Sequence, residues 1–240
     1  TNKKAKDGQK SESAYSIIEK GGYTIARGYS DFEQKAATTD KMVLFQTEKK
    51  GDSLPYSIDQ TDEDLNLADI TRAGISFLTK DASSKGFFLM VEGGKIDYAC
   101  HATDAATTVH EVNDMAKSVA LALEFYAKHP NETLILVTAD HETGGLDLGH
   151  GAYELHPENL QYQACSKDVL NFKLMKLAMD NAGEPSWAQV KALLKENWEG
   201  LAKLAELLID KEVIMAEDIE AIFGPKAGKH GEERLKIENV

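Results

Sequence analysis

Hydrophobic residues follow two different spacings along the first 140 residues of the chain. Helical spacing predicts helices over residues 13–20, 67–79 and 107–128. Short or continuous apolar runs predict strands over residues 23–26, 42–46, 87–92 and 133–139. The last two are continuous apolar runs rather than alternating ones, which is typical of strands buried on both faces of a sheet. Turn formers and carboxylates predict a loop over 49–66.

The helix predicted at 107–128 separates the strands predicted at 87–92 and 133–139. This connection is long enough for a right-handed crossover between parallel strands of one sheet. The sequence therefore predicts an α/β fold with a largely parallel sheet flanked by helices. Ligands of such sheets bind at the carboxyl ends of the strands.

The chain changes character after about residue 159. Segments such as "VLNFKLMKLAMDNAG" and "SWAQVKALLKENWEGLAKLAELLID" have helical spacing, with Gly183-Glu184-Pro185 between them, and "MAEDIEAIFG" continues the pattern. We therefore expect a partial α/β core over 1–158, a helical insertion or cap over 159–225, and a polar tail over 226–240 that leads back to the core.

The composition of the chain excludes several classes of protein. The net charge is −13 over 240 residues, which argues against a general nucleic-acid or anionic-membrane surface. No apolar run reaches membrane-span length, and the first thirty residues contain no signal-peptide pattern. Cys100 and Cys165 do not define a redox compartment, and both a disulfide and two free thiols fit the sequence.

Carboxylate and imidazole side chains cluster after the last two predicted strands. "GGKIDYACH" places Asp97 and His101 four residues apart, downstream of Glu92, and "VTADHETGG" places Asp140 beside His141. Asp97 and His101 share one face if this turn is helical, and in a loop they can also converge on one ion. Imidazole with carboxylate suits zinc, whereas Glu92 alone suits a harder ion such as magnesium. The sequence predicts that the two pairs are neighbours at one edge of the sheet.

Other polar residues fit this pattern less well. We expect structural roles for His110 and for His129, which lies at a helix end where a cationic side chain suits the dipole. His150 and His156 are within reach of the second cluster, and His230 falls in the polar tail. The remaining acidic candidates are Asp104, Glu142 and Asp147, which suit either solvated loop positions or hydrogen bonds that orient metal ligands.

"FFLMVEGGKIDYACH" followed by "TLILVTADHETGG" resembles the metal-binding core of the alkaline phosphatases. The resemblance is close over 85–145 and looser over 11–84. It implies that Glu92 binds magnesium, that Asp97 and His101 bind one zinc, and that Asp140 and His141 bind a second. It further implies hydrolysis of phosphate monoesters to inorganic phosphate through a phosphoserine, a homodimer, and a periplasmic or extracytoplasmic location. Tyr98 occupies a position near the phosphate that varies within the family.

Several family features have no counterpart in this sequence. The nucleophilic serine of a D-S-A-like stretch is absent, because Ser53 follows Asp52 but precedes Leu54-Pro55 rather than a helix. Arg27, Arg72 and Arg234 do not match the phosphate-binding arginine, an upstream bridging aspartate is unmatched, and His230 does not match the third zinc ligand. With two ligands for each zinc, we expect weak metal binding and negligible phosphatase activity from this chain alone.

Two other functions remain open at this stage. One is a related metalloenzyme of the same superfamily, such as a phosphodiesterase, a phosphopentomutase or a sulfatase, although the V-E-G-G context of Glu92 favours the monoesterase because it implies a magnesium site. The other is a metal-binding or interaction module without catalysis.

Overall fold

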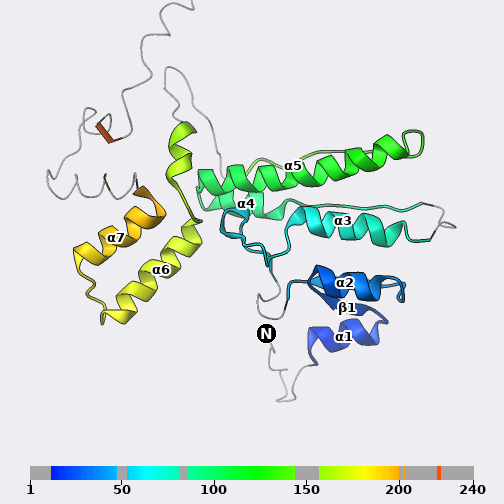
Figure 1. The fold of residues 1–240 in the computed structure, drawn as a ribbon, viewed down its shortest axis with the longest axis horizontal. Helices are drawn as coiled ribbons and strands as arrows, with labels where there is room; N and C mark the ends of the chain where they lie inside the picture. The colour runs from blue at the N-terminus through cyan, green and yellow to red at the C-terminus, as the bar shows by residue number, and fades with distance from the viewer. Residues whose placement is uncertain are drawn as a thin grey trace, which may run out of the picture. The chain divides into compact units, whose positions relative to one another are not determined.

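The computed structural model describes residues 12–47, 53–81, 86–143, 157–199, 203 and 221–222. Figure 1 shows the described helices and strands. The chain divides into two compact units. Unit 1 comprises residues 1–94 and 111–139, and unit 2 comprises residues 95–110 and 140–240.

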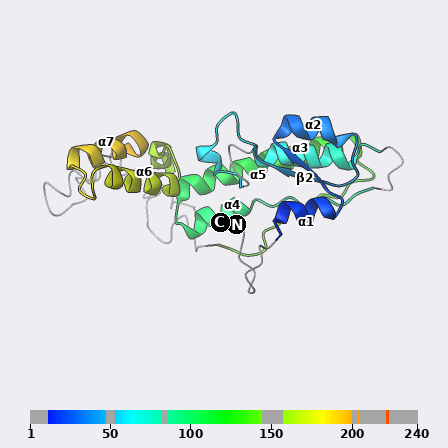
Figure 2. The same cartoon turned by 90° about the horizontal axis from the view of Figure 1, so that it is seen from below.

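The first unit contains a small parallel sheet between helices. Strands β1 (Thr24–Arg27) and β2 (Met42–Phe45) pair in parallel, with Thr24 opposite Met42. They lie between α1 (Ala14–Lys20) on one face and the helices α2 (Tyr29–Ala36) and α3 (Leu67–Leu78) on the other, as Figure 2 shows. The core of this layer is Ala26, Phe32 and Ala73. The predicted helices and strands of this region are thus confirmed to within one or two residues, whereas α2 was not predicted.

Gly28 makes the tight connection from β1 to α2 possible. Its φ is +78°, a conformation that residues with a side chain rarely adopt. A Cβ atom at this position would also lie 2.9 Å from Cγ2 of Thr47. Gly28 follows β1 directly and donates its N–H to the Phe45 carbonyl at the end of β2. The turn is therefore attached to both strands of the sheet.

Buried carboxylates of α5 (Ala105–Lys128) hold the loop and the helix that precede it in unit 1. Glu111 accepts hydrogen bonds from the backbone N–H and hydroxyl of Ser57, at the start of the 3₁₀ helix η2 (Ser57–Asp59). Asp114 accepts one from the N–H of Leu67, the first residue of α3. Charge at a helix start satisfies N–H groups that have no partner within the helix. Side chains of α5 therefore hold the loop predicted at 49–66 in place, over the part that the structure describes.

In unit 2, which begins at the second residue of α4 (Gly94–His101), this helix leads into the start of α5 through a turn with Thr103 at φ 53°. The 3₁₀ helix η3 (Pro157–Tyr162), α6 (Lys167–Asp180) and α7 (Trp187–Asn197) follow. Ser166 and Ser186 cap α6 and α7 with their hydroxyl groups. Cys165, Leu170 and Leu194 form a small core, with Trp198 packed against it. The helical character predicted after residue 159 is confirmed where this region is described.

Asp104 connects most of the described elements of unit 2. Its carboxylate is 4% exposed and caps α5 by accepting the N–H of Thr107 at 3.2 Å. It also accepts the side-chain amide of Gln163 at 2.6 Å and the N–H of Lys167, the first residue of α6, at 2.7 Å. Neither sequence-based expectation for Asp104 holds, because this carboxylate is neither solvated nor bonded to a candidate metal ligand in these contacts. It is a buried cap shared by two helices.

The strands predicted at 87–92 and 133–139 are not hydrogen-bonded strands in the described structure. Both run as extended segments in unit 1, the first after α3 and the second after α5, and both run in the same direction along these helices in Figure 1. The prediction of a ladder is therefore wrong for these two segments, although a parallel sheet flanked by helices is confirmed at β1 and β2. A strand requires a neighbour for its N–H and C=O groups, and the sequence pattern does not show whether one is present.

Two further sequence-based questions are answered by the described residues. Cys100 and Cys165 are buried thiols that are not joined in a disulfide, and the Cys100 thiol lies 3.7 Å from the Thr108 hydroxyl while the Cys165 thiol donates to Asn197 at 3.4 Å. None of the helices within the described ranges has the length and apolar composition needed to cross a membrane.

Candidate metal centre

Helix α4 places Asp97 and His101 on one face. The residues are four apart in a continuous helix, and Nε2 of His101 lies 3.4 Å from Oδ1 of Asp97. Two ligands of one tetrahedral zinc ion, each at 2.0–2.2 Å from the metal, are about 3.4 Å apart. The pair thus has the spacing that a shared zinc ion requires, and the helical alternative of the sequence analysis is the one observed.

Asp140 and His141 follow the extended segment 133–139. Nε2 of His141 lies 3.6 Å from Oδ2 of Asp140, and the Asp140 carboxylate also accepts the N–H of His141 at 3.1 Å. Adjacent residues of a regular strand point to opposite faces. Here residues 140 and 141 lie in a bend, and the 3.6 Å between Oδ2 and Nε2 shows that the two side chains approach each other. The Asp140 side chain is 91% exposed, so it is free to swing toward an ion.

Thr143 joins the two pairs. Its hydroxyl donates to Oδ1 of Asp97 at 2.9 Å and lies 3.4 Å from Nδ1 of His141. Residues 46 positions apart in the sequence are therefore connected through one hydroxyl group within unit 2. The prediction that the clusters are spatial neighbours is confirmed for Asp97 and His141. Sequence reasoning did not identify Thr143, because no residue spacing singles out this threonine in "DHETGG".

The hydrogen bond of His141 to its own loop defines which ring nitrogen is free. Nδ1 lies against the carbonyl oxygen of Glu142, which can only accept, so Nδ1 carries the proton. Nε2 of the neutral ring is then available to a metal ion, as in histidine sites where a backbone carbonyl fixes the tautomer. Glu142 thus contributes through its backbone.

This loop raises the pKa of His141 above its ordinary value. The main cause is the hydrogen bond to the Glu142 carbonyl, followed by the negative charge of Asp140 and, more weakly, that of Asp97. These interactions favour the imidazolium, so the stability they contribute is present at low pH and is lost as the pH rises through the raised pKa.

Replacing Asp140 by asparagine is expected to lower the pKa of His141 without returning it fully to the ordinary value, because the Glu142 carbonyl remains. The measurement is an NMR titration of the His141 ring in the metal-free protein with a chelator present. Asp180→Asn, which removes an exposed carboxylate at the end of α6, is the matched control and should leave the titration unchanged. An equal shift in both variants would contradict the assignment of the charge effect to Asp140.

Glu92 lies in unit 1, two residues before the start of α4. Its side chain is folded over Gly94, where a Cβ atom would be 3.3 Å from Oε1 of Glu92. The glycine at the first position of α4 therefore leaves room for this carboxylate at the start of the helix, where negative charge is favoured. A single carboxylate with free oxygen atoms is the chemistry that magnesium uses.

The candidate ligands do not form a complete site in the described ranges. Among these residues, no group of three or more His, Cys, Asp or Glu side chains is arranged to hold a metal ion. The donors nevertheless fit zinc in type and in pairwise spacing, as two half-sites with two ligands each. His150, His156, Asp147 and His230, considered above as further candidates, lie outside the described residues.

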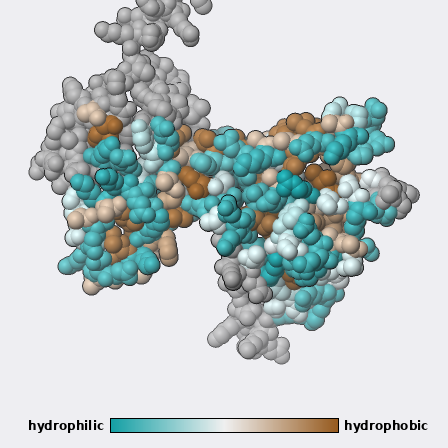
Figure 3. All heavy atoms as spheres, in the orientation of Figure 1, coloured by the Kyte–Doolittle hydropathy of each residue, from teal (hydrophilic) through white to brown (hydrophobic). Residues whose placement is uncertain are grey.

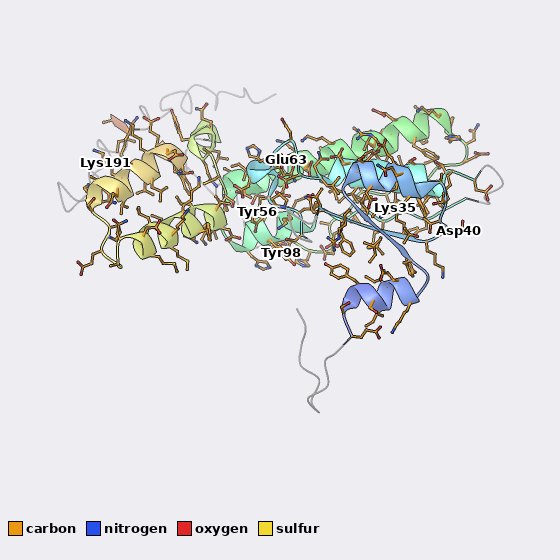
Figure 4. The ribbon with its side chains drawn as sticks, turned by 60° about the horizontal axis from the view of Figure 1, so that its bottom comes forward. Lys35, Asp40, Tyr56, Glu63, Tyr98 and Lys191 are labelled. Carbon is orange, nitrogen blue, oxygen red and sulfur yellow. The ribbon has the colours of Figure 1, made fainter. Side chains whose placement is uncertain are left out.

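The other described candidates lie on α4, on α5 and directly after α5, outside the two carboxylate–imidazole pairs. His129 stacks on Phe125 with ring centroids 4.6 Å apart, as expected for a residue at the end of α5, and His110 is exposed on the same helix. Tyr98 is exposed on α4, where Figure 4 labels it.

The described serine and arginine candidates do not resemble catalytic groups. Ser53 is exposed in a bend at which no helix begins. The Arg27 guanidinium lies over the ring of Tyr15, 4.9 Å from its centroid, and Arg72 pairs with Asp69 on α3 at 3.1 Å. Arg234 is outside the described residues.

Known proteins resemble this chain over most of its length. The family model of alkaline phosphatase matches residues 6–213. Alkaline phosphatase 3 of Bacillus subtilis is 31% identical over 212 residues, which is 88% of this chain and 44% of that protein. Streptomycin-6-phosphate phosphatase of Streptomyces griseus is 39% identical over 92 residues, 36% of this chain and 20% of that protein. The chain thus spans less than half the length of these relatives.

Solved structures give the same result for the fold. The cold-active alkaline phosphatase of Shewanella sp. superposes with a TM-score of 0.58 at 26% identity, covering 89% of this chain and 50% of that one. The alkaline phosphatase of Thermus thermophilus gives a TM-score of 0.59 at 21% identity, covering 91% and 47%, and supports the fold alone. The model match over most of the chain and the 31% identity to a Bacillus enzyme establish that this chain belongs to the alkaline phosphatase family.

Proposed function

We propose that this chain is the metal-binding part of a metal-dependent phosphomonoester hydrolase. The observation that carries the proposal is the Thr143 hydroxyl, which connects Asp97 of the first half-site to His141 of the second. An arrangement of two carboxylate–imidazole pairs linked in this way suits two zinc ions that act on one substrate. Family membership supports the same reaction class.

The residues divide into three proposed sites. Asp97 and His101 would hold one zinc ion, Asp140 and His141 would hold the second, and Glu92 would hold magnesium. When bound, the zinc ions supply positive charge to the phosphoryl oxygens and lower the pKa of a coordinated hydroxyl group or water. Thr143 orients the Asp97 carboxylate, and the Glu142 carbonyl keeps the proton of His141 on Nδ1.

Local positive charge is essential for this substrate class because the chain carries a net charge of −13. The two described arginines already have partners within unit 1, Arg27 in its aromatic contacts and Arg72 in its ion pair. We therefore propose that phosphate monoesters and inorganic phosphate are bound through the metal centre. The proposal extends to a phosphoserine route, a homodimer and an extracytoplasmic location in the intact enzyme, and to a helical insertion over 159–225.

The 240-residue chain by itself is expected to bind zinc weakly and to show negligible turnover. A zinc site takes three or four protein ligands, and each half-site supplies two. The test is elemental analysis after dialysis against trace zinc and magnesium, combined with an aryl phosphate assay in added zinc. Zinc well below stoichiometric amounts, without turnover, is the expected result.

Two other results would change the conclusion. Rapid turnover by the chain alone would mean that a nucleophile and further ligands are present in it, and would overturn the proposed dependence on other polypeptide. Stoichiometric zinc that is lost in Asp97→Ala or Asp140→Ala, without turnover, would favour a metal-binding module without catalysis. His110→Gln, which changes an exposed histidine outside the half-sites, is the control for both variants.

A further inference from the structure

Helix α4 ends at His101 and is followed by a turn with an uncommon backbone conformation. This α4–α5 turn consists of residues 102–104. Thr103 has a φ of 53°, a value that β-branched residues rarely adopt. The N–H groups of Thr103 and Asp104 donate back to carbonyl groups of α4 at 2.9 and 3.0 Å. The orientation of His101, as the last residue of α4, therefore depends on how firmly the turn is held.

The residues that lead into α6 contact the α4–α5 turn from outside. Lys167 donates its Nζ to the Ala102 carbonyl at 3.0 Å and its N–H to Oδ2 of Asp104 at 2.7 Å. Gln163 donates its side-chain amide to Oδ1 of Asp104 at 2.6 Å. The Ala102 carbonyl also accepts the Thr103 hydroxyl at 2.7 Å. The turn is thus bonded to a segment that lies 59–65 positions later in the chain.

These attachments to the turn are polar. The small core between α6 and α7 contains Cys165, Leu170 and Leu194, and among the described residues neither this core nor the side chains packed against it include α4 or the turn. The face of α6 and α7 that is visible in Figure 3 is also largely hydrophilic. Hydrogen bonds from residues 163–167, rather than apolar packing, therefore connect the two helices to the end of α4.

The charge of Lys167 is unexpected beside a cation site. Its ammonium group contacts the residue directly after His101, a proposed zinc ligand. A positive charge near a metal ion opposes binding of that ion. At the end of a helix, however, an ammonium group satisfies a carbonyl that has no partner within the helix and interacts favourably with the helix dipole. The contact therefore indicates that this lysine holds the end of α4.

We propose that Lys167 is a positioning residue of the first half-site and acts on His101 through the α4–α5 turn. The proposal rests on the proposed function, since it takes Asp97 and His101 as zinc ligands. The 3.4 Å between Oδ1 of Asp97 and Nε2 of His101 suits one zinc ion only while the end of α4 keeps its helical conformation. The start of α6 thereby contributes to metal binding without supplying a ligand.

The experiment compares Lys167→Met with the unaltered 240-residue chain in a titration with zinc at fixed pH, followed by NMR of the His101 and His141 rings. Half-saturation at His101 is expected at about fivefold higher zinc. The effect is smaller than the 10–100-fold loss typical for a direct partner of a ligand, because Lys167 bonds the next residue. His141, in the second half-site, should respond at unchanged zinc. Loss of the positive charge alone would shift His101 in the opposite direction.

Amide exchange in a chelator tests the turn without metal. The N–H groups of Thr103 and Asp104 are expected to exchange about tenfold faster in Lys167→Met. Lys167→Arg keeps the charge and an N–H donor, and should retain both the slow exchange and most of the zinc affinity. Lys173→Met is the matched control, because the Lys173 ammonium group donates to Asn197 between α6 and α7. This variant should leave the turn and the zinc affinity unchanged.

Three results would overturn the proposal. Unchanged exchange in Lys167→Met would mean that this lysine does not hold the turn. Faster exchange with unchanged or tighter zinc binding at His101 would mean that the turn does not position this ligand. Equal effects of Lys167→Met and Lys173→Met, or equal shifts at His101 and His141, would indicate a general loss of structure. A lack of zinc response in the unaltered chain would instead refute the proposed metal site, while the exchange measurement still decides whether Lys167 holds the turn.

Discussion

Asp104→Asn is expected to destabilise unit 2 by about 3 kcal/mol, since hydrogen bonds to a charged group contribute about 1.5–3 kcal/mol each and a buried group left without a partner costs about as much again. The carboxylate of Asp104 accepts from Thr107, Gln163 and Lys167, and all three donors are N–H groups. An asparagine has one acceptor oxygen in place of two. Its NH₂ group would therefore face a donor, either the Gln163 amide or the N–H of Lys167.

Urea denaturation followed by tryptophan fluorescence measures this effect directly. The two tryptophans of the chain are Trp187 at the start of α7 and Trp198 beside the small core, so the signal reports on unit 2. Asp180→Asn is the control, because it makes the same chemical change at an exposed site. A loss of stability as small as that of the control would show that Asp104 does not hold α5 and α6 together.

Asp97→Asn is expected to weaken zinc binding by the 240-residue chain about 100-fold, and Thr143→Val about tenfold. Asp97 is one of the two proposed ligands of the first half-site, and His101 is the other. Thr143 only orients the Asp97 carboxylate. Loss of an outer hydrogen-bond partner costs about 10–100-fold in metal affinity, and loss of a ligand costs at least as much. Both values come from competition titrations against a zinc chelator at fixed pH.

The valine variant distinguishes orientation from simple loss of structure. Valine has the shape of threonine without the hydroxyl group, so the loop keeps its volume. Thr138→Val, at an exposed threonine whose hydroxyl bonds only its neighbour's carbonyl, is the control. Equal zinc affinity in Thr143→Val and the unaltered chain would mean that the link between the half-sites has no part in metal binding.

The sequence predicted the helices of this chain well because each carries its own signals. Helical apolar spacing, together with caps such as Asn66 with Asp69 and Ser186 with Gln189, defines α3 and α7 through interactions within a few residues. The spacing of Asp97 and His101 also has a local meaning, since i and i+4 meet on any helix. Helix α2 has no side-chain cap of this kind, and its start depends on the turn at Gly28.

The tertiary structure decided what depends on distant partners. The apolar runs at 87–92 and 133–139 predicted strands, but a ladder depends on a neighbouring strand and not on the run itself. Asp104 is like many loop carboxylates in sequence, and only the packing of Gln163 and Lys167 around it makes it a buried cap. Likewise, the adjacency of Asp140 and His141 was evident from the sequence, while their connection to Asp97 through Thr143 required the chain to bend after residue 139. Local residue spacing determines the helices and the two carboxylate–imidazole pairs. Contacts between residues far apart in the sequence determine how these pairs come to lie beside each other.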